Sequence, residues 1–98
     1  MKLPGQCANL RELRAEIDRT DKELVRLLAR RAAYIERAAA IKAIEKLPPR
    51  IPQRVEEVVR NVRALAAAEG LDADLAEGLW RQMIEWSIAR EERLMAMD

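Results

Sequence analysis

Two cations interrupt the apolar face of the first amphipathic segment of this 98-residue chain, where charge is normally excluded. Arg31 and Lys42 lie in a stripe of apolar residues spaced alternately by three and four. Along a helix they would differ by about 20° in azimuth and by about 16 Å in height. Two long cationic side chains so placed can converge on a small dianion, or each can form a buried salt bridge, with Asp21 or Glu45 as candidate partners. Both alternatives supply the partner that a buried charge requires.

A third cation, Arg14, lies near the same stripe but too far away to join them within one chain. It would stand about 42 Å from Lys42 along the helix axis and be rotated by about 100° from Arg31. From a second chain packed antiparallel it could reach the same site. The alternative is a surface arginine. Arg54, beside a proline-rich loop, is uninformative on its own.

A carboxyl group interrupts an apolar face near the end of the chain. Glu91 falls on a helical face formed by Trp80, Ile84, Ile88 and Met95. Apolar surroundings favour the protonated form of a carboxyl, which can then donate a hydrogen bond. The alternative is a glutamate at a helix end, paired with Arg90 or Arg93.

The composition removes most other chemistry. The chain has no histidine and one cysteine, Cys7, so it lacks Ser-His and Cys-His pairs, imidazole ligands and an internal disulfide. None of its three glycines stands in a phosphate-binding GxGxxG or GxxxxGK pattern. We therefore expect no metal and no cofactor. An enzyme of this composition must work by binding and electrostatics.

Charge and hydropathy limit the partners. The formal net charge is +1, from 18 basic and 17 acidic residues, which predicts no general attraction to nucleic acid or to anionic membranes. No apolar run approaches the roughly 20 residues of a membrane span, and the first residues do not form a secretory signal. We expect a cytoplasmic protein without nucleic-acid or membrane partners.

Prolines and glycine divide the chain into three helical segments. Pro48, Pro49 and Pro52 interrupt the first half, and Gly70 with Asp72, a candidate N-cap, interrupts the second. We expect a single all-α domain over residues 1–98. Its parts are helix 1 at about 9–46, a loop at 47–52, helix 2 at about 53–69 and helix 3 at about 73–95.

The length of the first helix requires a second chain. It would extend for nearly 60 Å (~1.5 Å per residue), whereas a compact monomer of this size has a radius of gyration of about 13 Å. A dimer is the simplest solution. The third helix is apolar on nearly all sides, since a second face carries Leu75, Leu79, Met83, Trp86 and Leu94. We expect it to be a buried central helix.

These features together resemble a known family. The segments that carry the resemblance are residues 13–21 (LRAEIDRTD), 27–31 (LLARR), 41–42 (IK), 53–54 (QR) and 84–87 (IEWS) with Glu91. The chain is similar to the all-helical (AroQ) class of chorismate mutases over nearly its whole length. Within that class it most resembles the isochorismate-pyruvate lyases of salicylate and siderophore synthesis, through residues 1–7 and 70–80.

The resemblance implies an intertwined homodimer of three-helix chains, with two sites that each take residues from both protomers. It implies that Lys42 contacts the ether oxygen of the enolpyruvyl group and that Glu91 donates to the same oxygen. Both reactions of the class are pericyclic and need no nucleophile, metal or cofactor. The substrate is a small dicarboxylate, isochorismate or chorismate. The substrate-binding positions are Arg14 of the partner subunit, Arg31, Arg54 and Ser87.

The chain departs from the class at two positions. Val55 stands where many mutases carry an acidic residue that binds the C4 hydroxyl of chorismate. Isochorismate has its hydroxyl at C2, so Val55 fits a lyase. Glu91 stands where many members have glutamine, and it must be protonated to donate, so we expect activity to fall as pH rises. The loop from Glu45 to Gln53 is expected to be the lid over the site.

Three functions remain open from the sequence. The first is an isochorismate-pyruvate lyase, forming salicylate and pyruvate, with residual chorismate mutase activity. The second is a mutase acting on chorismate or on 4-amino-4-deoxychorismate. The third is a non-catalytic helical dimerisation module, in which Arg31 and Lys42 would form internal ion pairs. We favour the first, because a dimerisation module has no use for Arg14, Arg31, Lys42 and Arg54 matching site positions together.

Overall fold

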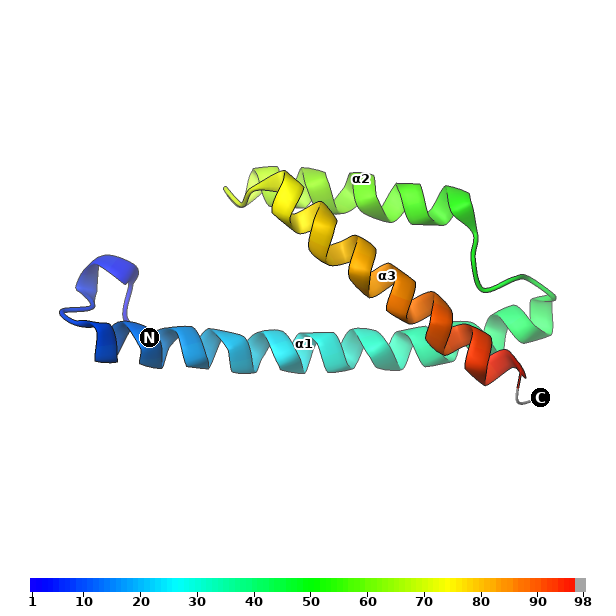
Figure 1. Ribbon diagram of the computed structural model, residues 1–98, viewed down its shortest axis with the longest axis horizontal. Coiled ribbons are helices and arrows are strands. Elements are labelled where there is room, and N and C mark those ends of the chain that lie inside the picture. The colour runs from blue at the N-terminus through cyan, green and yellow to red at the C-terminus, as the bar shows by residue number, and fades with distance from the viewer. Residues whose placement is uncertain (97–98) are drawn as a thin grey trace. The chain divides into compact units, whose positions relative to one another are not determined.

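The computed structural model describes residues 1–96 and is helical throughout, apart from the connections (Figure 1). A short 3₁₀ turn, η1 (Pro4–Gln6), precedes α1 (Leu10–Glu45), α2 (Pro52–Ala68) and α3 (Ala73–Ala96). The described residues contain no strand, so the predicted all-α class with one long and two shorter helices is confirmed. The last two residues of the predicted domain lie outside the described part. None of the described helices is both long enough and apolar enough to cross a bilayer.

The chain divides into two compact units, residues 1–33 and residues 34–98. In unit 1, side chains fix the start of α1. Asn9 Oδ1 accepts a hydrogen bond from Glu12 N at 2.9 Å, and the Glu12 carboxylate accepts one from Ala8 N at 2.8 Å. Lys2 Nζ lies 3.0 Å from Glu12. The Ala8 hydrogen bond, reinforced by Lys2, lowers the pKa of Glu12. This reciprocal arrangement satisfies amide groups that a helix N-terminus leaves open.

The part of α1 in unit 1 has an exposed apolar stripe. All residues from 1 to 33 are described, and none of them is buried. Leu10, Ile17, Leu24 and Leu28 of the predicted stripe are 61%, 49%, 51% and 45% exposed. An apolar stripe on a helix normally faces a packing partner. The single chain leaves these four side chains about half exposed to solvent.

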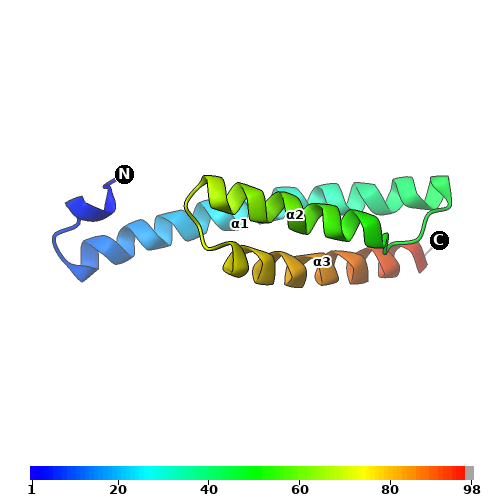
Figure 2. The same cartoon turned by 90° about the horizontal axis from the view of Figure 1, so that it is seen from above.

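Unit 2 is built on the antiparallel pair α2 and α3, which lie side by side (Figure 2). Apart from Ala39 of α1, its buried apolar residues come from both helices and form two clusters. One contains Val59, Ile84 and Ile88, with Val55 and Val58 packed against it. The other contains Val62, Ala66 and Ala76, with Val58 and Trp80 packed against it. These clusters hold the two helices in register.

Helices α1 and α2 both end at a residue with positive φ, which is a lysine in α1 and a glycine in α2. Leu71 N donates to Ala66 O at 2.8 Å with Gly70 at φ +73°, as expected for the glycine that ends helix 2. Leu47 N donates to Lys42 O at 2.9 Å, and here Lys46 takes the left-handed conformation, at φ +59°. Only glycine adopts this conformation without steric cost.

The start of α3 follows the sequence prediction, but the burial of α3 does not. Asp72 Oδ1 accepts from Asp74 N at 2.8 Å and from Leu75 N at 3.2 Å, which confirms Asp72 as the N-cap. The single chain does not bury α3 as the central helix that the sequence predicts, because Leu75, Leu79 and Trp86 are about half exposed (52%, 49% and 49%). The buried contacts of α3 lie on its other face.

Candidate active site

The two residues predicted to act in catalysis face each other in unit 2. Lys42 Nζ, near the end of α1, lies 2.8 Å from Glu91 Oε1 on α3. Their side chains are 19% and 4% exposed. This oxygen is buried without a hydrogen-bond partner among the described residues. The contact is an ion pair, because opposite charges attract at this distance whatever the angle.

Glu91 is held on an otherwise apolar face of α3. Ile84, Ser87, Ile88 and Glu91 are all buried, and their spacing of three, one and three places them on one side of the helix. Ser87 Oγ donates to Met83 O at 2.8 Å, a hydrogen bond within the helix. Ser87 and Glu91 are therefore the two polar side chains that this buried face presents.

The local ion-pair partners considered from the sequence are wrong for both residues. Lys42 pairs with neither Asp21 nor Glu45, and Glu91 pairs with a residue of another helix. Arg90 pairs instead with Glu36, 2.9 Å away. The pairing of Lys42 with Glu91 joins positions 49 apart in the sequence, for which helical spacing offers no signal.

The loop between α1 and α2, residues 46–51, is attached beside this pair. Lys42 Nζ donates to Pro49 O at 2.7 Å. Arg50 donates to both oxygens of Glu85 on α3, at 3.0 and 2.6 Å. The hydrogen bond from Arg50 lowers the pKa of Glu85, and Glu85 raises that of Arg50. The sequence did not predict this contact, because a pair 35 residues apart leaves no local pattern.

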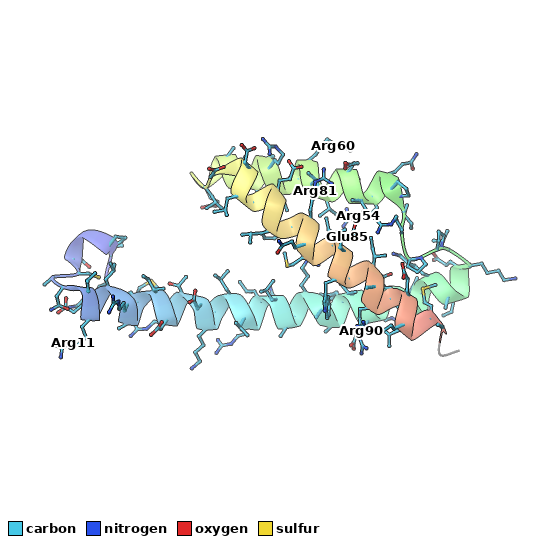
Figure 3. All side chains as sticks on the ribbon, in the orientation of Figure 1. Arg11, Arg54, Arg60, Arg81, Glu85 and Arg90 are labelled. Atoms are coloured by element: carbon cyan, nitrogen blue, oxygen red, sulfur yellow. The ribbon has the colours of Figure 1, made fainter. Side chains whose placement is uncertain are left out.

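Arg54 lies in the first turn of α2 and pairs with Glu57 on the same helix. Both side chains are more than half exposed (62% and 52%), and Figure 3 labels Arg54 on α2. The contacts of Arg54 in this structure are thus separate from the Lys42–Glu91 pair. Its neighbour Val55 is half-buried and packs against the cluster of Val59, Ile84 and Ile88. Val55 therefore contributes to the core of unit 2.

Arg14 and Arg31 belong to unit 1, on α1. Arg14 is exposed and Arg31 is partly buried. Their part in the site stays a prediction. Within residues 1–96, no three His, Cys, Asp or Glu side chains are grouped so as to hold a metal ion. The polar groups that unit 2 offers here are the half-buried ammonium of Lys42, the buried carboxyl group of Glu91 and the buried hydroxyl of Ser87.

Comparison with known proteins identifies the family. Residues 13–92 match the chorismate mutase type II family. The chain is 40% identical over 91 residues to the isochorismate pyruvate lyase of Pseudomonas aeruginosa, covering 93% of this chain and 89% of that protein. It is 33% identical over 84 residues to the T-protein of Haemophilus influenzae, covering 86% of this chain and 22% of that protein.

A third relative covers less of the chain. The bifunctional chorismate mutase/prephenate dehydratase of Aquifex aeolicus is 43% identical over 56 residues, which are 57% of this chain and 16% of that protein. The family match and the first relative each extend over most of the sequence. The resemblance noted in the sequence is thereby confirmed: the chain belongs to the chorismate mutase type II family of enzymes.

Proposed function

We propose that this chain is an isochorismate-pyruvate lyase, converting isochorismate to salicylate and pyruvate, with chorismate mutase as a side activity. The observation that carries the proposal is the Lys42–Glu91 pair, half-buried at Lys42 and buried at Glu91, in a chain 40% identical, over nearly its full length, to an isochorismate pyruvate lyase. The composition supports it, because the reaction is pericyclic and does not need the histidine that the chain lacks.

Lys42 supplies the main electrostatic contribution in this mechanism. As the C–O bond of the enolpyruvyl ether breaks, negative charge grows on the ether oxygen. A fixed cation at that oxygen stabilises the transition state more than the ground state. An ammonium has three N–H donors. Among the described residues, Pro49 O and Glu91 are the polar groups that Lys42 Nζ contacts, so a third direction is open to the substrate.

Glu91 and the arginines complete the proposed site. Glu91 donates a second hydrogen bond to the ether oxygen once it takes up a proton, and taking up that proton ends its ion pair with Lys42. Arg31, Arg54 and Arg14 of the partner subunit bind the two carboxylates and hold the substrate in its reactive conformation. Ser87 lines the same face of α3 as Glu91. For Arg54 to bind substrate, it exchanges its contact with Glu57 for a substrate carboxylate.

The site as proposed needs a homodimer. The exposure of Leu10, Ile17, Leu24 and Leu28 supports a second copy as the partner of α1, since these residues continue the stripe that contains Arg31 and Lys42. Mixing two inactive variants tests this directly. Arg14→Ala and Lys42→Ala chains, unfolded and refolded together, form some mixed dimers, in which one of the two sites has both residues intact.

Random pairing predicts recovery of about one quarter of wild-type activity. If Arg14 acted within its own chain, no mixed dimer would contain an intact site, and activity would stay absent although mass spectrometry showed mixed dimers. Sedimentation of the wild-type protein at the mass of one chain would also contradict the dimer.

Chorismate mutase as the main activity is the second candidate. Two observations favour it: the family match, and the relative from Aquifex aeolicus that is named as a chorismate mutase. A paired assay decides between the candidates. Purified protein is given isochorismate, with salicylate fluorescence as readout, and chorismate, with loss of its absorbance as readout.

Faster formation of salicylate than loss of chorismate establishes the lyase. Faster loss of chorismate than formation of salicylate makes the protein a mutase that works with Val55 in place of an acidic residue. Absence of both activities would overturn the proposal and direct the assay to the 4-amino analogue of chorismate. The cytoplasmic location expected from the sequence stays a prediction.

A further inference from the structure

Consecutive residues attach the loop 46–51 to two different helices. Pro49 presents its carbonyl to Lys42 Nζ of α1 at 2.7 Å, and Arg50 donates to both carboxylate oxygens of Glu85 on α3, at 3.0 and 2.6 Å. A two-pronged arginine–carboxylate contact is geometrically specific, because both N–H groups must be in line with their oxygens. All four residues belong to unit 2.

The two attachments are mechanically coupled through one peptide group. The carbonyl of Pro49 and the amide nitrogen of Arg50 belong to the same planar unit. When Arg50 is anchored, the direction of the Pro49 carbonyl is restricted. That carbonyl and Glu91 are the two groups that orient the Lys42 ammonium. The direction in which the third N–H of Lys42 points therefore depends on the contact between Arg50 and Glu85.

We propose that Arg50, anchored on Glu85, is a positioning residue that holds the Pro49 carbonyl against Lys42 and so directs the ammonium toward the reacting ether oxygen. The inference rests on the proposed function and adds a residue pair to it. It differs from a role in which Arg50 leaves Glu85 and binds a substrate carboxylate itself.

Kinetics separate the two roles. If Arg50 positions Lys42, Arg50→Ala and Glu85→Gln each lower kcat about three- to fivefold, the size expected for an exposed pair, with little change in KM. The double variant is no worse than either single one, because the two residues act as a unit. Arg50→Lys, which keeps the charge without the two-pronged geometry, recovers part of the loss.

Arg81→Ala is the matched control. Arg81 is exposed to a similar degree (44% against 48% for Arg50) and is also ion-paired, but to Glu56 and Glu77. Its kcat should equal that of the wild type. A rise in KM for Arg50→Ala, together with normal kinetics for Glu85→Gln, would overturn the proposal in favour of a direct substrate contact.

A second readout does not depend on which reaction the protein catalyses. Trace acetylation of the full-length protein by acetic anhydride, followed by mass spectrometry, measures how accessible Lys42 is relative to the exposed Lys22. Labelling of Lys42 should rise about threefold or more in Arg50→Ala and in Glu85→Gln, and should not change in Arg81→Ala. Unchanged labelling of Lys42 in all three variants would overturn the proposal even if the wild-type enzyme were inactive on both substrates.

Discussion

Two groups of ion pairs in unit 2 use the same side-chain chemistry in different surroundings. The buried pair joins Lys42 to Glu91 at 2.8 Å, with side chains 19% and 4% exposed. The surface network, which lies on α2 and α3, has similar distances, from 2.7 to 3.1 Å, and side chains 29% to 88% exposed. It consists of Glu56, Arg63, Asp74, Glu77 and Arg81.

The difference in burial between the two groups separates charges that serve the surface from charges that can serve catalysis. Exposed ion pairs are screened by water and contribute little to the free energy of unfolding. The surface network is therefore expected to stabilise the packing of α2 on α3 only weakly. Burial makes charge expensive, because the ions lose their hydration. The Lys42–Glu91 pair is best explained by what a fixed, partly desolvated ammonium can do to a growing negative charge.

The largest expected effect is that of Lys42→Ala. Removing the cation at the ether oxygen should lower kcat by about 10²- to 10³-fold or more, because charge stabilisation in the transition state is lost. Steady-state kinetics on isochorismate and chorismate measure the change. Lys46→Gly, which removes a neighbouring lysine in the loop, is the control and should keep its activity. A near-normal kcat for Lys42→Ala would remove the catalytic assignment.

Glu91→Gln tests the other half of the buried pair through its pH profile. If Glu91 donates as a protonated acid, wild-type activity should fall as pH rises from 5 to 8, because a carboxylate has no proton to donate. An amide donates without taking up a proton, so the variant should have a flatter profile. A wild-type profile that is already flat over this range would exclude the protonated donor.

A pair of changes at the two helix ends should have opposite signs. Lys46→Gly relieves a left-handed backbone conformation at the end of α1 and should stabilise the protein by about 1 kcal/mol. Gly70→Ala places a side chain in the same conformation at the end of α2 and should destabilise it by about as much. Urea unfolding measures both, and equal signs would contradict the explanation.

The smallest effect is expected in the surface network. The hydrogen bond from Arg81 lowers the pKa of Glu77, with a further contribution from Arg63. A lowered pKa means that the stabilisation is present above the pKa of Glu77 in the unfolded chain and disappears as pH falls through its lower pKa in the folded protein. Arg81→Ala should therefore lower Tm by about 2 °C at pH 7 and by nothing near pH 2. An equal loss at both pH values would show that packing, not charge, is responsible.

Several elements could be predicted from local patterns. The N-cap Asp72 and the terminal Gly70 were found because capping depends on residues a few positions apart. The capping role of Asn9 was missed, although the signal was available in Glu12 three residues later. The pairs Lys42–Glu91 and Arg50–Glu85 could not be predicted from local patterns, because each pair joins two different elements that are far apart in the sequence.

The sequence by itself determined that the chain is all-α with three helices, that its chemistry is electrostatic, and that charges at positions 31, 42 and 91 stand on apolar faces. Periodicity and residue type are local properties, so they can be read along the chain. The tertiary structure alone decided that Lys42 meets Glu91, that the Pro49 carbonyl shares the same ammonium, and that one face of α3 stays half exposed. Those facts depend on which surfaces of separate helices pack together, and helical spacing within one segment carries no information about that.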